Sequence, residues 1–379
     1  MTKKSITFVN RHYPPNLNVT GENVWDLATY LIQHHDIEVH IVHVDRQYTG
    51  GGVQRKPVGH IHKVKTIYTG SNRLLRYLAG LWDGYFLTKK SKKINKGPIV
   101  LLTSPPLLPM WGSMMLKKNE WILWSMDLFP EGFGAIHEIK KSSWFYQFSY
   151  RKTYQNVPSK VIALGPKQKE HLDSKYRKKI PGTILPCGVF SENISDISTP
   201  IWKKEPDKIY FGYLGNCGIP HNPDFVKAVM DAIDPERHVM ILVAYGIYAD
   251  ELKSYAKGKK GIQIMDNVPR PELNHIDVHC VTLLPSWTHI AVPSKAVSSV
   301  TSGSAMIFCG STESDNWYLL KDAAWHVNDE YYLKDQVKNL VNSITKEEII
   351  SKRENAKRIS KQLVSMINTS YIEIASWAK

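Results

Sequence analysis

The sequence predicts an α/β protein made of two parallel-sheet domains in series. Its 379 residues suit two domains at about 150 residues each. Short runs of Val, Ile and Leu alternate with helical stretches, which is typical of parallel sheets covered on both faces. The charge is divided unevenly, because residues 1–190 carry 28 basic and 12 acidic side chains, whereas residues 191–379 carry 21 and 23. This division indicates two domains with different partners.

The elements of the first domain follow from these apolar runs. A loop rich in Pro and Gly separates the first strand from a helix that we expect from residue 22 to about residue 34. A Pro pair stops the third strand. The expected strands are residues 6–10, 37–42, 99–104, 121–126 and 161–164.

The second domain repeats this pattern after a linker expected at residues 191–207, where Pro and small polar residues are frequent. A helix is predicted at about residues 223–233, and a lysine-rich helix from about residue 346 to the end. The predicted strands are residues 209–214, 239–244, 262–265, 280–284 and 305–309. Two such domains would place the carboxyl ends of their strands, where ligands of open α/β sheets bind, across one cleft.

Cysteine usage and hydropathy indicate the compartment. The four cysteines lie far apart without metal-binding or redox spacing, so buried free thiols are expected. The first residues lack a signal-peptide pattern, and no apolar run reaches the ~18 residues that span a bilayer. We expect a cytoplasmic protein that is at most peripheral to a membrane. The fifteen histidines form no helical ligand pair, so no metal site is expected.

The strongest candidate for chemistry follows the strand at residues 121–126. Asp127 and Glu131 lie four residues apart, with a proline between them that prevents the strand from continuing. Such a loop can present one carboxylate to substrate hydroxyls and the other as a proton acceptor. The alternative is that Asp127 only caps the following helix.

A candidate phosphate site lies at Pro293, Ser294 and Lys295, which open a predicted helix. Free backbone N–H groups and the positive end of the helix dipole suit a phosphate, and Lys295 adds a charge. An ordinary Ser-capped helix with a solvated lysine is the alternative. His289, four residues before Pro293, is a further candidate for ligand contact.

Two glycine-containing loops follow the first strand of each domain. Gly215 and Asn216 begin a loop that ends in Gly218. Its glycines allow a ligand to approach the backbone, although a tight turn is the favoured explanation. In the first domain, the corresponding loop ends at Gly21. Neither loop has the spacing of an ATP-binding or dinucleotide-binding motif.

Basic and aromatic residues gather in two segments of the first domain, residues 73–93 and 140–152. Lys and Arg beside Trp, Tyr and Phe suit the interface of an anionic membrane. The alternatives are an amphipathic helix with its aromatics in the core, and nucleic-acid binding, for which the sequence has no reading module.

Taken in order, these motifs resemble those of family 4 glycosyltransferases, which have the GT-B fold of two facing Rossmann-like domains. The branch that builds bacterial surface polysaccharides is most similar. The resemblance covers almost the whole chain and rests on short segments at residues 8–15, 103–106, 127–131, 161–164, 185–189, 214–216, 268–273 and 292–295. It implies an acceptor domain at residues 1–190, a donor domain at 191–360, and a final helix, 361–379, that returns to the first domain.

The resemblance also implies the reaction. A sugar moves from a nucleotide-sugar, with UDP the expected nucleotide, to a polysaccharide or lipid-linked oligosaccharide, with retention of configuration and without metal or other cofactor. Asp127 corresponds to the position that contacts the donor sugar, and Gly21, Gly215 and Asn216 to loops near the diphosphate. Val268 corresponds to the position that reads the base. The partners are therefore the donor, the glycan or lipid-linked acceptor and an anionic membrane surface, and not nucleic acid.

Two departures from this family concern the donor. The family has a Glu four residues after the Ser of Pro-Ser-Lys, where this chain has Ser298, and a basic residue after the glycine loop, which is missing here. Three alternatives follow: Ser298 or Ser299 contacts the ribose instead, the donor is atypical, or the activity is weak. The alternative function is a catalytically degenerate protein that binds a glycan or a protein partner.

Overall fold

The computed structural model of the protein describes residues 3–46, 53–70, 72–116, 121–135, 139–188 and 198–379. The chain divides into two compact units. Unit 1 comprises Met1–Leu185 and Met366–Lys379, and unit 2 comprises Pro186–Ser365. We predicted the corresponding boundaries after residues 190 and 360. The first of these, with residues 191–197 of the expected linker, lies outside the described residues.

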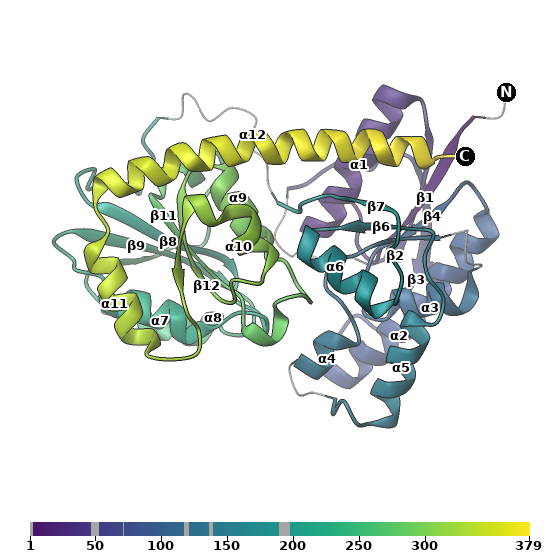
Figure 1. Ribbon diagram of the computed structural model, residues 1–379, viewed down its shortest axis with the longest axis horizontal. Helices are drawn as coiled ribbons and strands as arrows, with labels where there is room; N and C mark the ends of the chain where they lie inside the picture. The colour runs from purple at the N-terminus through teal and green to yellow at the C-terminus, as the bar shows by residue number, and fades with distance from the viewer. Residues whose placement is uncertain (1–2, 47–52, 71, 117–120, 136–138, 189–197) are drawn as a thin grey trace. The chain divides into compact units, whose positions relative to one another are not determined.

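Unit 1 contains a seven-stranded parallel sheet in its described part, with the order β3-β2-β1-β4-β5-β6-β7 (Figure 1). All five predicted strands are present, while the edge strands β3 and β7 were not predicted. The strands are β1 Ser5–Val9, β2 Glu38–Asp45, β3 His60–Lys65, β4 Ile99–Leu101, β5 Trp121–Trp124, β6 Lys160–Ala163 and β7 Gly182–Ile184.

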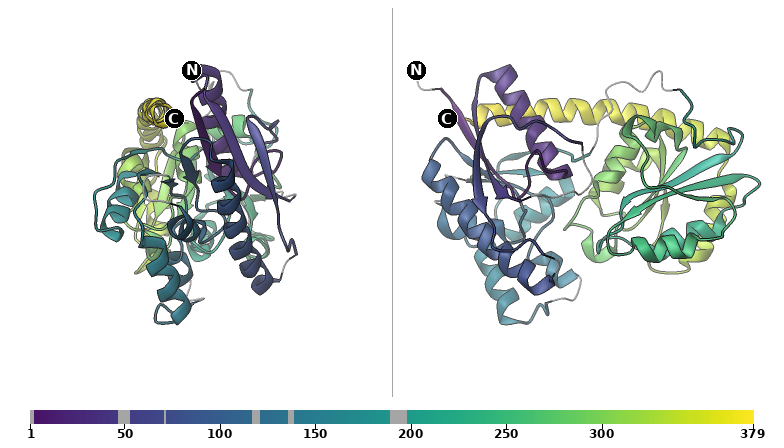
Figure 2. Two further views of the ribbon diagram at one scale, coloured as in Figure 1. Left: turned by 90° about the vertical axis from the view of Figure 1, so that its right-hand side faces the viewer. Right: turned by 180° about the vertical axis from the view of Figure 1, so that it is seen from behind.

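The helices of unit 1 cover both faces of this sheet. The chain reverses direction across the sheet after β3, and right-handed crossovers then put α1 on one face and α2, α3, α5 and α6 on the other. Figures 1 and 2 show this arrangement. The helices are α1 Val19–His35, α2 Arg73–Ile94, α3 Leu108–Met115, α4 Glu131–Ala135, α5 Trp144–Tyr154 and α6 Pro166–Lys175.

Unit 2 contains a six-stranded parallel sheet with the order β10-β9-β8-β11-β12-β13 among the residues that the structure describes. Its five predicted strands are present, and the edge strand β13 was not predicted. The strands are β8 Ile209–Asn216, β9 His238–Tyr245, β10 Ile262–Ile264, β11 Val278–Thr282, β12 Ala305–Cys309 and β13 Ala324–Val327.

The helices of unit 2 cover its sheet in the same way, with α7, α8 and α11 on one face and α9 on the other (Figure 1). Phe211 and Tyr213 of β8 pack into the core under α7, whereas Tyr210, which precedes Phe211, points to the opposite face. The helical segments are α7 Pro223–Ala232, α8 Ala249–Ala256, η1 Arg270–His275, η2 Pro285–Trp287, α9 Ser294–Thr301, α10 Asp315–Leu320, η3 Lys321–Ala323, α11 Leu333–Ser343 and α12 Lys346–Trp377.

The C-terminal end of α12 belongs to unit 1. The backbone N–H of Ser5 donates to the carbonyl of Lys379 at 2.7 Å, so the last residue bonds to the first strand. The Ser370 hydroxyl donates to the carbonyl of Ile184 at 2.7 Å, and the Tyr371 ring lies 5.0 Å from the ring of Tyr30 on α1. These contacts hold the end of α12 beside β7 and α1.

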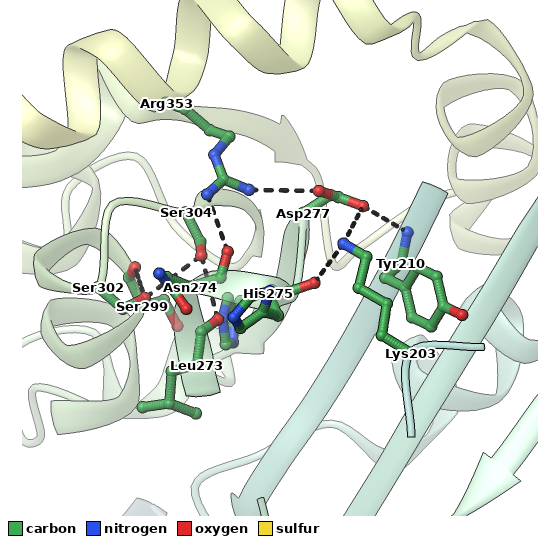
Figure 3. Close-up of polar contacts among 11 residues, drawn as sticks. Lys203, Tyr210, Leu273, Asn274, His275, Asp277, Ser299, Ser302, Ser304 and Arg353 are labelled. Atoms are coloured by element: carbon green, nitrogen blue, oxygen red, sulfur yellow. Dashed lines mark hydrogen bonds and ion pairs between the residues drawn. The ribbon is translucent and has the colours of Figure 1, made fainter. Parts of the chain in front are cut away.

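A partly buried charge network braces the amino-terminal edge of unit 2's sheet, opposite its carboxyl edge (Figure 3). Asp277, just before β11, accepts hydrogen bonds from the Tyr210 backbone N–H at 2.8 Å and from the Arg353 guanidinium at 3.2 Å. The Lys203 ammonium, 3.7 Å from the same carboxylate, also donates to the carbonyl of His275 at 2.8 Å. One carboxylate therefore anchors the segment before β8, the strand β8 and helix α12.

The cysteine prediction is confirmed, because all four cysteines are buried and free. Burial raises the pKa of Cys217, Cys280 and Cys309. Raised thiol pKa values oppose thiolate formation, so these side chains act as small apolar residues in the core.

Candidate functional site

The candidate donor site lies at the carboxyl edge of unit 2's sheet, where strand order reverses. From the central strand β8 the chain goes through α7 to β9 on one side, while β11 pairs with β8 on the other. Ligands of open α/β sheets bind outside such a reversal. The two loops there are held together, because His221 Nδ1 lies 2.7 Å from the Thr282 carbonyl oxygen and the Leu284 N–H donates to Pro220 at 2.8 Å.

Lys295, in the first turn of α9 after β11, is bonded directly to the end of β8. Its ammonium donates to the backbone carbonyl of Asn216 at 2.8 Å and to the hydroxyl of Tyr213 at 3.0 Å, and it lies 4.3 Å from the centre of the Tyr213 ring. Burial lowers the pKa of Lys295 to about 8, with a small opposing effect from Cys217. The lysine is therefore not a freely solvated side chain, and its charge is held at one place beside the end of β8.

The first turn of α9 supplies backbone donors next to this charge. Pro293 is the N-cap, and among the described residues no side chain caps this end of the helix, so the Ser-capped alternative is wrong. The Pro293 carbonyl accepts a hydrogen bond from the buried Asn316 amide at 3.2 Å. The N–H groups of Ser294 and Lys295 belong to the first turn, which has no intrahelical acceptors. Together with the helix dipole they can bind an anion.

Gly215 occupies a backbone conformation that requires glycine. Its φ is +115°, a region that residues with a Cβ rarely adopt. Among the described residues, chain neighbours aside, an added Cβ would have only Tyr245 Oη within 4 Å, at 3.8 Å, so space does not limit this position. The glycine thus sets the direction in which the chain leaves β8 toward Asn216.

Three further predicted donor residues lie in unit 2. Val268 is 6 % exposed and packs in the apolar cluster on the face opposite α7, so its backbone rather than its side chain is left for base recognition. His289 is half-buried between η2 and α9. The Ser298 hydroxyl donates to the Ser294 carbonyl at 3.0 Å, and the Ser299 hydroxyl donates to the Lys295 carbonyl at 2.7 Å. Both hydroxyl groups therefore donate hydrogen bonds to backbone carbonyls of α9 itself.

Gly21 differs from its expected place. We predicted it in a loop, but α1 begins at Val19, so Gly21 lies in the first helical turn. The Asn18 side chain caps this helix and accepts from the Gly21 N–H at 3.4 Å. The sequence signal for this correction is the Asn18 N-cap, a residue type that is favoured at helix starts. A Cβ at Gly21 would lie 3.1 Å from the His12 carbonyl oxygen, which indicates close backbone packing.

Asp127 lies in the loop after β5, as predicted, with an exposed side chain. The surrounding protein nonetheless raises the pKa of its carboxyl to about 6 through desolvation. Asp127 does not cap α4, because that helix begins at Glu131. An accessible carboxyl that titrates at about pH 6 can bind hydroxyls in its ionised form at neutral pH.

Glu131 has a different environment from Asp127. It is 7 % exposed, and the Tyr154 hydroxyl donates to its Oε1 at 2.6 Å. Burial raises the pKa of Glu131, while the Tyr154 hydrogen bond opposes the rise. The structure therefore does not bring the two predicted carboxylates into one accessible pair.

Unit 1 also places cationic side chains at the carboxyl edge of its sheet. Arg11 follows β1 and forms an ion pair of 2.9 Å with Asp83 of α2, whose side chain is fully buried. Burial lowers the pKa of Arg11, and the positive charges of Arg46 and Arg76 act in the same direction while Asp83 opposes them. The sequence did not predict this cluster, nor the contact of Tyr213 with Lys295, because the residues involved lie far apart in the chain.

No group of three or more His, Cys, Asp or Glu side chains in the described ranges is placed to hold a metal ion. No helix in that part of the chain is both long enough and apolar enough to cross a bilayer.

No protein-family profile and no curated protein sequence matches the chain significantly. Solved structures do match. WaaG, a glycosyltransferase involved in lipopolysaccharide biosynthesis, has a TM-score of 0.69 at 10% identity, over 97% of this chain and 98% of WaaG. Sucrose-phosphate synthase from Thermosynechococcus elongatus has a TM-score of 0.69 at 12% identity, over 97% of both chains. HepE from Anabaena, solved with UDP and glucose, has a TM-score of 0.64 at 12% identity, over 98% of this chain and 100% of HepE.

At these identities the similarity establishes the fold. The prediction of two Rossmann-like parallel-sheet domains is confirmed, and the chain has the GT-B fold of these glycosyltransferases.

Proposed function

We propose that this protein is a retaining, metal-independent glycosyltransferase that transfers a sugar from a nucleotide-sugar to a polysaccharide or lipid-linked oligosaccharide. The observation that carries the proposal is the position of Lys295. Its ammonium is held within hydrogen-bonding distance of the Asn216 carbonyl, next to the first turn of α9. A donor's diphosphate is the anion that this combination of a fixed cation and helix N–H groups suits.

The chemistry of sugar transfer explains why such a site is needed. The bond between the anomeric carbon and the diphosphate oxygen breaks, a bond from that carbon to an acceptor hydroxyl oxygen forms, and the hydroxyl proton passes to the departing diphosphate. Negative charge develops on the departing diphosphate. The Lys295 ammonium and the N–H groups of Ser294 and Lys295 would stabilise that charge without a metal ion. Asp127 would bind hydroxyls of the donor sugar.

Support for a UDP-sugar donor and a surface-glycan acceptor comes from similar structures. HepE was solved with UDP and glucose, and WaaG takes part in lipopolysaccharide biosynthesis. For the acceptor side, Arg11, Arg46 and Arg76 offer cations to a phosphate-bearing acceptor. A protein of this kind would work in the cytoplasm, with an anionic membrane as the place where a lipid-linked acceptor is met.

The test is sugar-nucleotide turnover by the purified full-length protein, after a thermal-shift screen of nucleotides has identified the donor. Lys295→Ala is expected to lower kcat/KM at least tenfold, since a charge-assisted hydrogen bond contributes about 1.5–3 kcal/mol. Asp127→Ala is expected to lower kcat. Lys334→Ala, at an exposed position of α11, is the matched control and should leave both constants unchanged. Turnover should also persist in a chelator.

Two results would contradict the proposal. Unchanged turnover in both the Lys295 and Asp127 variants would remove these residues from the site. Failure to bind any nucleotide or nucleotide-sugar in calorimetry would favour the alternative, a catalytically degenerate glycan- or partner-binding protein. Ser298 in place of the family's Glu is the observation that motivates this alternative.

A further inference from the structure

Helix α2 of unit 1 exposes an apolar and aromatic stripe that continues into lysines. Leu75, Leu78 and Trp82 are 43%, 50% and 43% exposed. Phe86 and Lys89 continue the same spacing of three or four residues, which keeps all five side chains on one face of the helix. The rings of Trp82 and Phe86 are 4.5 Å apart, and the Lys89 ammonium lies 5.9 Å from the Phe86 ring. We call these five residues the α2 stripe.

Helix α5 repeats the order of aromatic, aromatic and lysine. Trp144 is 76% exposed and stacks on Phe148 with ring centres 5.2 Å apart and planes inclined by 18°. The Lys152 ammonium lies 6.0 Å from the Phe148 ring. We call these three residues the α5 ladder. Helices α2 and α5 belong to the same layer over one face of the sheet, with α3 between them (Figures 1 and 2).

Core packing does not account for the exposed stripe. Helix α2 contacts its neighbours through Tyr77 and Leu81, which pack against Leu107, Met110 and Phe133, and through Tyr85, whose ring lies 5.3 Å from that of Trp111 on α3. Tyr77 and Leu81 lie on a different face of α2 from Leu78 and Trp82. An aromatic and leucine row that faces solvent is therefore additional to what the fold needs.

The charge around the stripe has one sign. Lys89, Lys90, Lys92 and Lys93 are all exposed, and the sequence has no Asp or Glu from residue 84 to 119 or from residue 139 to 169. The one acidic residue in α2, Asp83, is buried against Arg11. A partner that fits must accept Trp and Leu side chains beside several lysines, and must carry negative charge itself.

We propose that the α2 stripe and the α5 ladder dock this protein onto the surface of an anionic lipid bilayer. Trp82 and Trp144 would lie at the level of the headgroups, with Leu75 and Leu78 reaching the acyl boundary. The ammonium of Lys89 and its neighbours would contact lipid phosphates at the end of their flexible stems. The purpose of this docking rests on the proposed function, because docking would bring unit 1 to a lipid-linked acceptor.

The experiment measures co-sedimentation of the full-length protein with vesicles of phosphatidylcholine alone and of phosphatidylcholine mixed with phosphatidylglycerol. Wild type should bind the mixed vesicles, and binding should weaken with salt. Lys89→Gln with Lys93→Gln should lower the partition coefficient about thirtyfold, which is about 2 kcal/mol, at about 1 kcal/mol per basic residue. Trp82→Ser with Trp144→Ser should abolish detectable binding.

Matched controls lie on unit 2. Lys334→Gln with Lys338→Gln removes the same charge from exposed positions of α11, and Tyr331→Ser removes an exposed aromatic. Both should bind the mixed vesicles like wild type. Thermal unfolding of every variant checks that a loss of binding is not a loss of structure.

Three outcomes would overturn the docking proposal. The first is equal binding to neutral and mixed vesicles, and the second is unchanged binding of the lysine variant. The third is a protein that forms a dimer and does not bind vesicles, and whose dimer dissociates when both tryptophans are replaced. The last would identify a second copy as the partner. Vesicle binding needs no turnover, and turnover with a water-soluble acceptor needs no vesicle, so failure of docking and failure of the glycosyltransferase proposal are told apart.

Discussion

The ammonium of Lys295 lies 2.8 Å from the carbonyl oxygen of Asn216, although the two residues are 79 positions apart in the chain. This bond joins the end of β8 to the first turn of α9, across the point where strand order reverses. The Tyr213 ring beneath the ammonium completes the contact. A cation fixed in this way loses little side-chain entropy when an anion binds, which favours recognition of a diphosphate.

We expect donor binding to depend on the protonation of Lys295. Burial lowers the pKa of Lys295 to about 8, so the ammonium is present below that pH and is lost above it. The affinity for the nucleoside diphosphate, measured by calorimetry, should therefore fall about tenfold or more as pH rises through about 8. Lys295→Arg keeps its charge throughout this range, and an identical alkaline loss in that variant would contradict the assignment.

An acid limit is expected from Asp127. Desolvation raises the pKa of its carboxyl to about 6, so the carboxylate that would bind donor hydroxyls is lost as pH falls through about 6. The rate kcat/KM should decline tenfold per pH unit below that value. Asp127→Asn should be much slower and lack this limb. If the decline of kcat/KM at acid pH persists in Asp127→Asn, the titration of another group causes it.

Glu131 is expected to affect stability more than turnover. Burial raises its pKa in the folded state above the unfolded value, so its contribution to stability is present below the unfolded pKa and is lost as pH rises through the folded pKa. Denaturant unfolding of Glu131→Gln should show a flatter pH dependence and no loss of stability at neutral pH. Tyr154→Phe should cost about 1–3 kcal/mol in the wild-type background and less in the Gln background, because it removes the hydrogen bond that the Tyr154 hydroxyl donates to a buried carboxyl group. A large loss of turnover in Glu131→Gln at unchanged stability would instead support the predicted catalytic role.

Removing the carboxylate of Asp277 should destabilise unit 2. Asp277→Ala leaves the Tyr210 N–H without its acceptor and leaves the Arg353 guanidinium bonded to the Asn274 carbonyl, at an expected cost of about 1–3 kcal/mol. Denaturant unfolding measures this, and Asp277→Asn should lose less because it keeps an oxygen for the Tyr210 N–H. Glu313→Ala, at an exposed loop position, is the control for removal of a single negative charge. A cost no larger than that of the control would show that Asp277 is not the anchor.

Strand prediction succeeded where burial on both faces dictates an apolar run and failed at three edges of the sheets. Strand β3, with the sequence His-Ile-His-Lys-Val-Lys, buries only Val64, and β7 has only three residues. Strand β13 is interrupted by half-buried Trp325 and His326. Edge strands are held chiefly by backbone hydrogen bonds to one neighbour, and backbone bonds leave little trace in side-chain pattern.

The sequence by itself determined the two-domain α/β architecture, the uneven charge and the loops that follow the strands, because burial period and turn residues are local properties. Tertiary structure alone decided which of those residues meet. It joined Lys295 to Asn216 and Tyr213, separated Glu131 from Asp127 by burying it against Tyr154, and put Gly21 inside a helix. Exposure and pKa depend on atoms supplied by distant segments, and no local pattern encodes their distances.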